Sequence, residues 1–194
     1  MSRYRKILAA IDGSDSSKNA LREACRQVKK YNGLLTAMTV VPIHQAEVEV
    51  LTVRERIIST LRAECEKIVD EARKIAEEED VFLRTKLVEG EPSMAIIDEA
   101  EEGGYDLVVV GREGQSHIEK VLMGSVAARI IGMSQSDVLV IPGDAAIAWR
   151  NILLVVERSK YLDVAAKKAM DIGKSYGSDI VKAICVVDVT QTNS

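Results

Sequence analysis

The stretch Asp106-Leu107-Val108-Val109-Val110-Gly111-Arg112-Glu113-Gly114 is an apolar run that ends in a glycine-rich loop. Such runs are typical of strands buried on both faces, which occur in parallel sheets covered by helices. Four further segments also have strand patterns, and helical patterns separate them. The predicted strands are 7–11, Leu34–Val41, 82–88, 106–110 and Asp137–Ile141. The sequence therefore predicts an α/β fold, with an open five-stranded parallel sheet, helices on both faces and right-handed crossovers.

Apolar residues at helical spacing fill the intervals between these strands. The predicted helices cover 16–31, 47–79, 93–101 and Ser125–Met133. Asp15 or Ser16 is expected to cap the first helix, because a short oxygen-bearing side chain accepts hydrogen bonds from the amides of a first turn. The interval 47–79 is predicted to form one long helix or two helical pieces, and its many charges are expected to form a solvated face.

Composition and charge exclude several classes of protein. Among 194 residues, 47% are hydrophobic and 29% are charged, which is a globular balance. The net charge of −4 provides no overall basic field, so neither nucleic acid nor a membrane is predicted as a partner. No segment has the pattern of a targeting signal or of a membrane span. The three cysteines are odd in number and lack C-x-x-C spacing, which indicates reduced thiols of a cytoplasmic protein.

The C-terminal part of the sequence repeats its beginning. Arg150-Asn151-Ile152-Leu153-Leu154-Val155-Val156-Glu157 resembles Arg5-Lys6-Ile7-Leu8-Ala9-Ala10-Ile11-Asp12, and a helical pattern and a strand pattern over 180–187 follow. The sequence thus predicts a complete domain over 1–144, followed by a linker and a partial β-α-β repeat over 145–194. Such a short unit seldom buries a core of its own. Either the chain is cut short, or the unit borrows a core from the first domain or from another subunit.

The glycines that follow the fourth predicted strand favour an anion site. Gly111 and Gly114 let the backbone approach a ligand closely, and Gly124 and Ser125 open a helix whose first amides are donors at the positive end of the helix dipole. The spacing matches neither a Walker A loop nor the G-x-G-x-x-G dinucleotide turn. The alternative is that these glycines only permit turns. The repeat contains no second glycine loop and has Glu157 in place of Asp12, so one site is expected per chain.

The pattern G-x2-G-x9-G-S at Gly111, Gly114 and Gly124-Ser125 resembles the nucleotide-binding signature of the universal stress protein family. The opening K-I-L-x-x-x-D, Gly90-Glu91-Pro92 and the segment 138–142 extend the resemblance over 1–143. It implies a Rossmann-like sheet in the order 3-2-1-4-5 that binds ATP or AMP at the carboxyl ends of its strands, in agreement with the rule for open α/β sheets. The partial repeat is similar to the start of a tandem second domain.

The resemblance also implies which residues bind the nucleotide. Ala10 and Ile11 would line the nucleoside pocket, Val40 would face adenine, and Asp12 would serve the ribose or a Mg²⁺ ion. The ribose and phosphate end would be formed by Val110, Gly111, Arg112, Gly114, Gly124, Ser125 and Val126. Asp12 is alternatively an ordinary turn residue. Arg112 and Lys120 either pair with phosphate charge or are solvated loop residues.

The function that this resemblance implies is a nucleotide-responsive stress or regulatory module. Family members commonly pair through the last strand of the sheet, which predicts a homodimer through Asp137–Ile141. One alternative is a slow ATPase or a nucleotidyl-transfer enzyme, and another is an interaction protein that binds no nucleotide. The sequence has neither an S-G-G-x-D-S loop nor an H-x-G-H motif, and Asp12 is its obvious metal candidate, so no catalytic residue is predicted.

Overall fold

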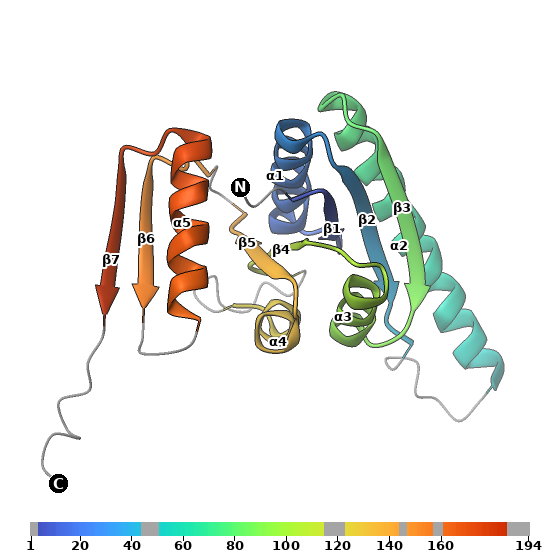
Figure 1. Ribbon diagram of the computed structural model, residues 1–194. Coiled ribbons are helices and arrows are strands. Elements are labelled where there is room, and N and C mark those ends of the chain that lie inside the picture. The colour runs from blue at the N-terminus through green and yellow to red at the C-terminus, as the bar shows by residue number, and fades with distance from the viewer. Residues whose placement is uncertain (1–3, 44–50, 115–122, 144–146, 157–160, 186–194) are drawn as a thin grey trace, which may run out of the picture. The chain divides into compact units, whose positions relative to one another are not determined.

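A computed structural model describes residues 4–43, 51–114, 123–143, 147–156 and 161–185 of the chain. The chain forms two compact units, one over Tyr4–Ala146 and one that contains Ile147–Ser194, and each is described by itself. The first unit is an α/β domain with a five-stranded sheet (Figure 1). Among the described residues, no helix has both the length and the apolar character needed to cross a membrane.

The sheet of the first unit has the strand order β3-β2-β1-β4-β5, and all four strand pairs are parallel. Its strands are β1 (Lys6–Ala10), β2 (Leu34–Val41), β3 (Leu83–Glu89), β4 (Leu107–Gly111) and β5 (Asp137–Ile141). The predicted strand order and parallel sheet are therefore confirmed. Because the strands are parallel, their carboxyl ends meet at one edge of the sheet.

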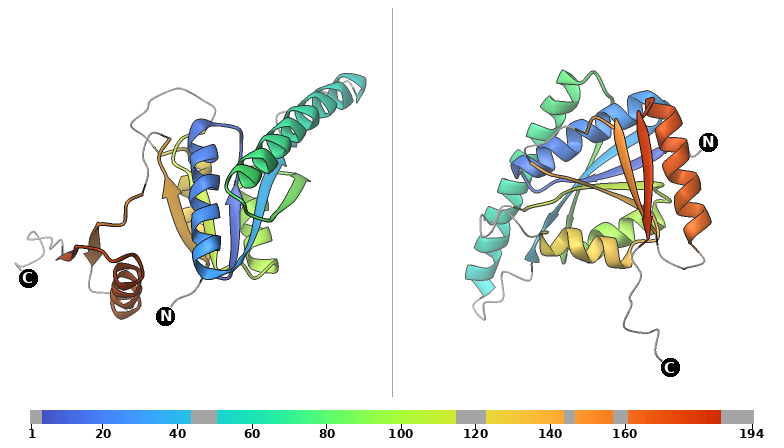
Figure 2. Two further views of the ribbon diagram at one scale, coloured as in Figure 1. Left: turned by 90° about the horizontal axis from the view of Figure 1, so that it is seen from above. Right: turned by 90° about the vertical axis from the view of Figure 1, so that its left-hand side faces the viewer.

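Helices cover both faces of this sheet (Figure 2). They are α1 (Asp15–Tyr31), α2 (Leu51–Glu78), α3 (Pro92–Glu102) and α4 (Ser125–Met133), with α1 and α2 on one face and α3 and α4 on the other. Leu8 and Met38 point to the second face, where they pack with Ile96 of α3 and Ile130 of α4. Each such aliphatic side chain contributes about 1.5–3 kcal/mol when fully buried.

The N-terminus of α1 differs from the prediction. Ser14 is the capping residue, not Asp15 or Ser16, and its Oγ accepts a hydrogen bond from the amide of Ser17 at 3.2 Å. The helix therefore begins at Asp15, and the amide that the cap satisfies lies three positions after the capping residue. Ser16, the other candidate, is buried and donates to the backbone carbonyl of Glu113 instead.

The long helix α2 is unbroken over Leu51–Glu78, and the start of the predicted interval lies outside the described residues. Its 28 residues span about 42 Å. Its N-terminal turns are mostly exposed and extend beyond the strands (Figure 1), while Cys65, Val69 and Ala72 are buried against the sheet.

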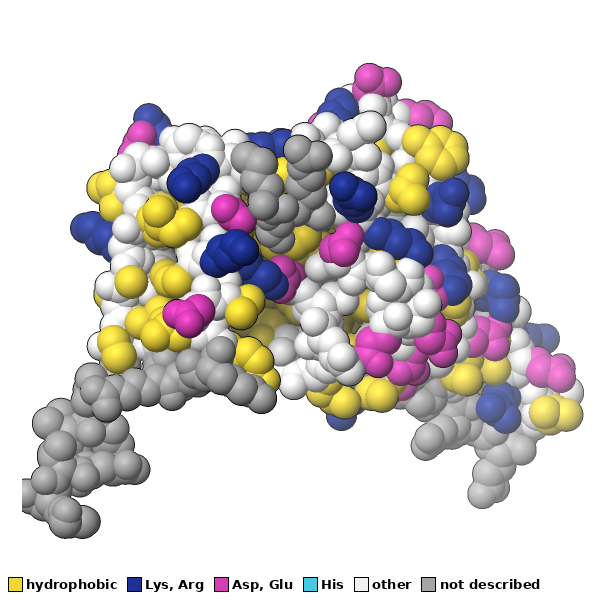
Figure 3. Space-filling view, viewed as in Figure 1, with side chains coloured by type: hydrophobic (Ala, Val, Ile, Leu, Met, Phe, Trp, Pro, Cys, Tyr) yellow, Lys and Arg dark blue, Asp and Glu magenta, His cyan; other side chains and the backbone are white. Residues whose placement is uncertain are grey.

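The outer edge of β3 carries charged side chains. Arg84, Lys86 and Glu89 are exposed, and the last two form ion pairs with Glu99 and Arg62. Figure 3, which is viewed as Figure 1, shows basic and acidic side chains interspersed over the region of β3 and α2. Charges of both signs along an edge strand disfavour pairing with a further strand.

The second unit contains β6 (Asn151–Val156), α5 (Leu162–Tyr176) and β7 (Ile180–Cys185). The two strands are parallel, and Trp149 stacks on Tyr176 with ring centroids 4.8 Å apart. This unit has the strand-helix-strand order that the sequence predicted. Whether it is the start of a second domain of the same kind stays a prediction, and Glu157 lies outside the described residues.

The register of the second unit matches that of β1 and β2. Asn151 pairs with Ile180 as Lys6 pairs with Leu34, so Leu153 corresponds in position to Leu8. Leu8 is fully buried beneath α3 and α4, whereas Leu153 is 59% exposed. One face of the two-stranded sheet therefore presents aliphatic side chains that the equivalent strands of the first unit bury.

Candidate functional site

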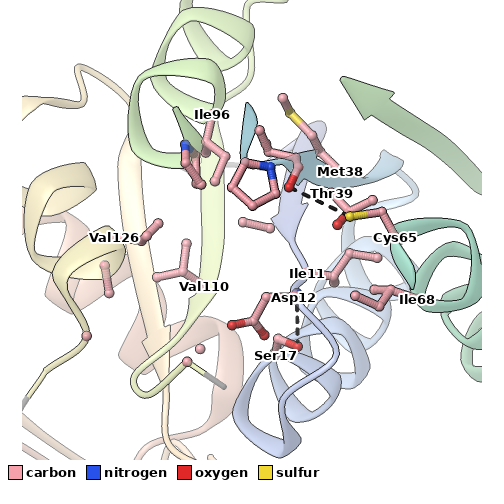
Figure 4. A pocket seen from close by; sticks show the side chains of 18 of the residues that line it. Ile11, Asp12, Ser17, Met38, Thr39, Cys65, Ile68, Ile96, Val110 and Val126 are labelled. Carbon is pink, nitrogen blue, oxygen red and sulfur yellow. Dashed lines mark hydrogen bonds between the residues drawn. The ribbon is translucent and has the colours of Figure 1, made fainter. Parts of the chain in front are cut away.

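A cavity of about 400 Å³ opens at the carboxyl ends of β1, β2 and β4. The chain leaves β1 towards β2 and leaves β4 towards β5, so the strand order reverses between these two neighbours. Open α/β sheets bind their ligands at this topological switch point. Figure 4 shows Val110 and Val126 on one side of the pocket and Cys65 and Ile68 of α2 on the other.

The structure brings all of the predicted site residues to this one cavity. They are Ala10, Ile11, Asp12, Val40, Val110, Gly111, Arg112, Gly114, Gly124, Ser125 and Val126. They come from the ends of three strands and from the start of α4. Their common location is thus a property of the fold, while their roles in binding stay predictions. Lys120 lies outside the described residues.

The glycines of the loop allow contacts that a side chain would prevent. A Cβ on Gly111 would lie 2.8 Å from both the carbonyl carbon of Ser16 and the amide nitrogen of Ser17. A Cβ on Gly114 would lie 3.2 Å from Asp12 Oδ2, and one on Gly124 would lie 3.3 Å from the carbonyl oxygen of Arg112. The backbone of the loop therefore packs directly on the start of α1.

Hydrogen bonds fix this loop on both sides. Arg112 N donates to Ile141 O at 2.8 Å, and Gly124 N donates to Arg112 O at 2.7 Å. The Ser16 hydroxyl donates to the carbonyl oxygen of Glu113, and Ser14 Oγ lies 3.3 Å from the same oxygen. The described part of the loop is thus held by β5, by α4 and by the first turn of α1.

Asp12 is oriented by the turn that precedes α1. Its Oδ1 accepts hydrogen bonds from the amide and the hydroxyl of Ser14, at 3.0 and 2.6 Å. Its own amide donates to Ser17 Oγ at 3.4 Å (Figure 4). The turn chemistry expected of Asp-Gly-Ser is therefore present, and the same turn directs Oδ2 towards Gly114.

The opposite end of the cavity is formed by β2 and α2. Ile11 N donates to Met38 O, which closes the pairing between the end of β1 and β2. Because the backbone groups of a strand alternate in direction, the carbonyl of Val40 points past the end of β1 towards the cavity. Cys65 Sγ donates to this oxygen at 3.8 Å. Burial raises the pKa of the Cys65 thiol, so the thiol stays protonated and remains a donor near neutral pH.

The helix α2 contributes pocket residues that sequence reasoning missed as site residues. Leu61, Glu64, Cys65 and Ile68 line the cavity and lie on one face of the helix. Their spacing of three and four residues was a signal for a helix face, but the sequence did not show what that face adjoins. The other lining residues that were missed are Ser17, Met38, Thr39, Pro42, Pro92, Ile96, Glu113 and Ala127.

Metal ligands are sparse in the described part of the chain. Within it, no group of three or more His, Cys, Asp or Glu side chains is arranged to hold a metal ion. Asp12 contributes one carboxylate at the end of β1, beside the glycine loop. A metal ion at this position would need most of its ligands from a bound molecule or from water.

These features define an open, doubly wound α/β protein with a ligand-sized pocket at its switch point. A model of the universal stress protein family matches residues 3–142. Universal stress protein MJ0531 of Methanocaldococcus jannaschii is 33% identical over 139 residues, which cover 71% of this chain and 82% of the relative. The chain therefore belongs to the universal stress protein family.

Two solved structures are similar to the structure of this chain. One is a universal stress protein in complex with cAMP, which is 29% identical, has a TM-score of 0.57, and covers 72% of this chain and 98% of its own. The other is a universal stress protein from Archaeoglobus fulgidus, with a TM-score of 0.75 over 96% of this chain and 67% of its own. Its identity of 21% shows the fold alone.

Proposed function

We propose that this chain binds an adenine nucleotide, ATP or AMP, in the cavity at the ends of β1 and β4. The observation that carries the proposal is the convergence of the predicted nucleotide-binding residues on one cavity of about 400 Å³. This volume falls in the range of about 300–1,000 Å³ that is usual for small-molecule sites. The relative solved in complex with cAMP supports a ligand of this class.

The adenine ring is proposed to occupy the end of the cavity at β2, which α2 and α3 border. Ile11, Ile68 and Ile96 provide apolar surface there for a flat ring. The backbone edge of Val40 faces the same space and would meet the polar edge of the base. A cavity with apolar walls and few directional polar groups is typical of sites that orient a nucleobase.

The phosphates are proposed to lie against the glycine loop and the start of α4. Gly124 is the N-cap of α4 and makes no side-chain capping bond. The first amides of α4 and the Ser125 hydroxyl therefore stand at the positive end of a helix dipole, where an anion is stabilised. Gly111 and Gly114 add backbone surface that no Cβ obstructs.

Asp12 is the residue proposed to contact the ribose or a Mg²⁺ ion. Its position fits either partner, because the turn at Ser14 holds Oδ1 and directs Oδ2 towards Gly114. Mg²⁺ commonly binds through one or two carboxylates together with the phosphates of a nucleotide. Such an ion would offset phosphate charge, while Asp12 would hold and orient it.

The regulatory part of the proposal is a homodimer through β5, whose association the nucleotide changes. β5 pairs with β4 and forms an edge of the described sheet. Val138, Leu139 and Val140 on this strand are half-buried, and Ile131 and Met133 of the adjacent α4 are about half exposed. An apolar edge strand is suited to pairing with a second copy. The nucleotide would shift association by its different affinity for the two states.

Calorimetric titration of ATP and AMP into nucleotide-free protein, with and without Mg²⁺, tests the binding proposal. We expect saturable binding near one site per chain. Gly124→Val should abolish it, because the new side chain would fill the space beside Arg112 O and Gly114 N.

Gly132→Ala is the matched control, since a Cβ at this α4 position meets no atom within 4 Å. It should bind as the wild type does. Absence of both binding heat and a thermal shift with either nucleotide would overturn the proposal, as would equal binding by Gly124→Val.

A further inference from the structure

We propose that the Glu113 carboxylate makes this pocket select against highly charged ligands. Among adenine nucleotides it would then favour those with one phosphate, AMP or a cyclic monophosphate, over magnesium-free ATP. The inference rests on the proposed function, because it concerns the same pocket. It assigns Glu113 a part in specificity.

The described lining of the pocket is rich in negative charge. Its ionisable carboxylates are those of Asp12, Glu64 and Glu113, and its cationic group is the guanidinium of Arg112. Three carboxylates against one guanidinium give this part of the wall a net negative charge. A polyphosphate therefore meets an unfavourable field within the described lining, and backbone amides are its main source of stabilisation there.

The guanidinium of this lining is already engaged by its neighbour. Arg112 Nε donates to Glu113 Oε1 at 2.7 Å, and Nη2 donates to the same oxygen. The two side chains are 39% and 26% exposed, so solvent screens the pair only in part. A phosphate that approaches Arg112 must either displace Glu113 or remain close to its negative charge.

The backbone keeps Glu113 in this position. Its carbonyl oxygen accepts a hydrogen bond from the Ser16 hydroxyl and lies 3.3 Å from Ser14 Oγ, and the amide of the preceding residue donates to Ile141 O. Gly114 follows directly and lies against Asp12. The backbone at Glu113 is thus fixed, and the ion pair with Arg112 holds its carboxylate at the cavity that both residues line.

The repulsion grows with the charge of the ligand. Near neutral pH a cyclic monophosphate carries about one negative charge, AMP about two and ATP about four. In a partly solvated site, one additional pair of like charges separated by several ångströms changes the binding affinity by about tenfold. Neutral adenosine does not feel this effect, so it measures binding of the base and ribose alone.

The test compares the affinities of adenosine, cAMP, AMP and ATP for three proteins at fixed ionic strength in the presence of a chelator. The proteins are the wild type, Glu113→Gln and Glu101→Gln. Glu101 is an exposed carboxylate of α3 outside the pocket, so its variant controls for the change in net charge. Melting curves confirm that each variant is folded, and Glu113→Ala provides a second way to remove the carboxylate.

For the wild type we expect cAMP and AMP to bind at least about tenfold more tightly than ATP. Glu113→Gln should strengthen ATP binding about tenfold and leave adenosine binding unchanged, while Glu101→Gln should change neither. An ATP-to-AMP affinity ratio that both Glu113 variants leave unchanged would overturn the inference while the proposed function stands. If not even adenosine binds, the proposed function itself is wrong.

Discussion

Gly111 at the end of β4 lies so close to Ser16 in the first turn of α1 that a Cβ on the glycine would be 2.8 Å from the serine carbonyl carbon. This contact joins the end of one strand to the start of the helix that follows its neighbour. Both elements border the cavity, because Val110 and Gly111 of β4 and Ser17 of α1 line it. The fold itself therefore needs a glycine at this position.

Gly111→Ala should destabilise the protein. The added methyl group would meet backbone atoms that cannot rotate away, and overpacking of this kind costs about 1–3 kcal/mol of unfolding free energy. Urea denaturation measures the loss. Gly132→Ala on α4 is the matched control and should be neutral or stabilising by up to about 1 kcal/mol, because alanine is the better helix former. Equal stability of the two variants would contradict this packing account.

Glu91 should contribute stability that acid removes. Burial opposes its ionisation, but hydrogen bonds from the Ser93 hydroxyl and from the amides of Met94 and Ser93, together with the charge of Arg129, lower the pKa of the carboxyl. The contribution of Glu91 to the free energy of unfolding is thus complete at pH values above the usual pKa of 4.5. It is lost as the pH falls through the lowered pKa.

Glu91→Ala removes this cap from α3 and should cost about 1 kcal/mol near neutral pH. The difference in unfolding free energy between wild type and variant should shrink as the pH is lowered below 4.5. Denaturation curves recorded across this range measure the difference. If the difference in unfolding free energy stays constant or increases in acid, Glu91 does not act through its charge.

The proposed dimer edge can be blocked without breaking the sheet. Asp137 N donates to Asp106 O just before β4, and Ile141 O accepts from Arg112 N just after it. Val140 therefore directs its backbone amide to the outer side of β5. Val140→Pro removes that donor and should shift the wild-type dimer to monomer. Sedimentation velocity at micromolar concentration measures the change.

Thr85→Pro is the corresponding change on the outer side of β3, at the opposite edge of the sheet. It should leave the dimer intact. A wild-type protein that sediments as a monomer would refute the dimer. Dissociation by Thr85→Pro alone would show that the interface lies at β3 and not at β5. Melting curves identify variants that have lost the fold.

The three cysteines should react with an alkylating reagent in a fixed order. Cys185 is exposed, Cys65 is 7% exposed and Cys25 is fully buried. Burial raises the pKa of Cys25 to about 12 and also raises that of Cys65, which lowers the fraction of reactive thiolate. Peptide mapping after brief treatment at mildly alkaline pH should therefore find Cys185 first, Cys65 later and Cys25 only after unfolding. Faster labelling of Cys25 than of Cys185 would contradict the buried position of α1.

The sheet could be predicted because its strands are unusually clear in the sequence. The runs at Ile7 and Val108 are apolar without interruption, since both faces of their strands are covered, and turn residues follow each of them. The glycines at 111, 114 and 124 could also be assigned, because their spacing occurs together with the other motifs that resemble the family, and that joint pattern is specific. Residues that combine in this way at strand ends can be assigned to one site from the amino-acid sequence alone.

Other features depend on how the elements are placed in space. Cys65 and Ile68 were visible as an apolar helix stripe, but only the position of α2 over the end of β2 makes them pocket residues. Glu113 occupies one of the unspecified positions between two glycines of the motif, so the motif predicts no role for it. The cap at Ser14 was missed by one residue, because helix ends are set by individual backbone hydrogen bonds.

The most direct test of nucleotide binding in this pocket is a crystal structure of the protein grown with AMP. We predict the adenine ring at the end of β2, beside Val40 and Cys65, and the phosphate at the amides of Gly124 and Ser125. AMP bound elsewhere, or a pocket without AMP at a saturating concentration, would contradict it.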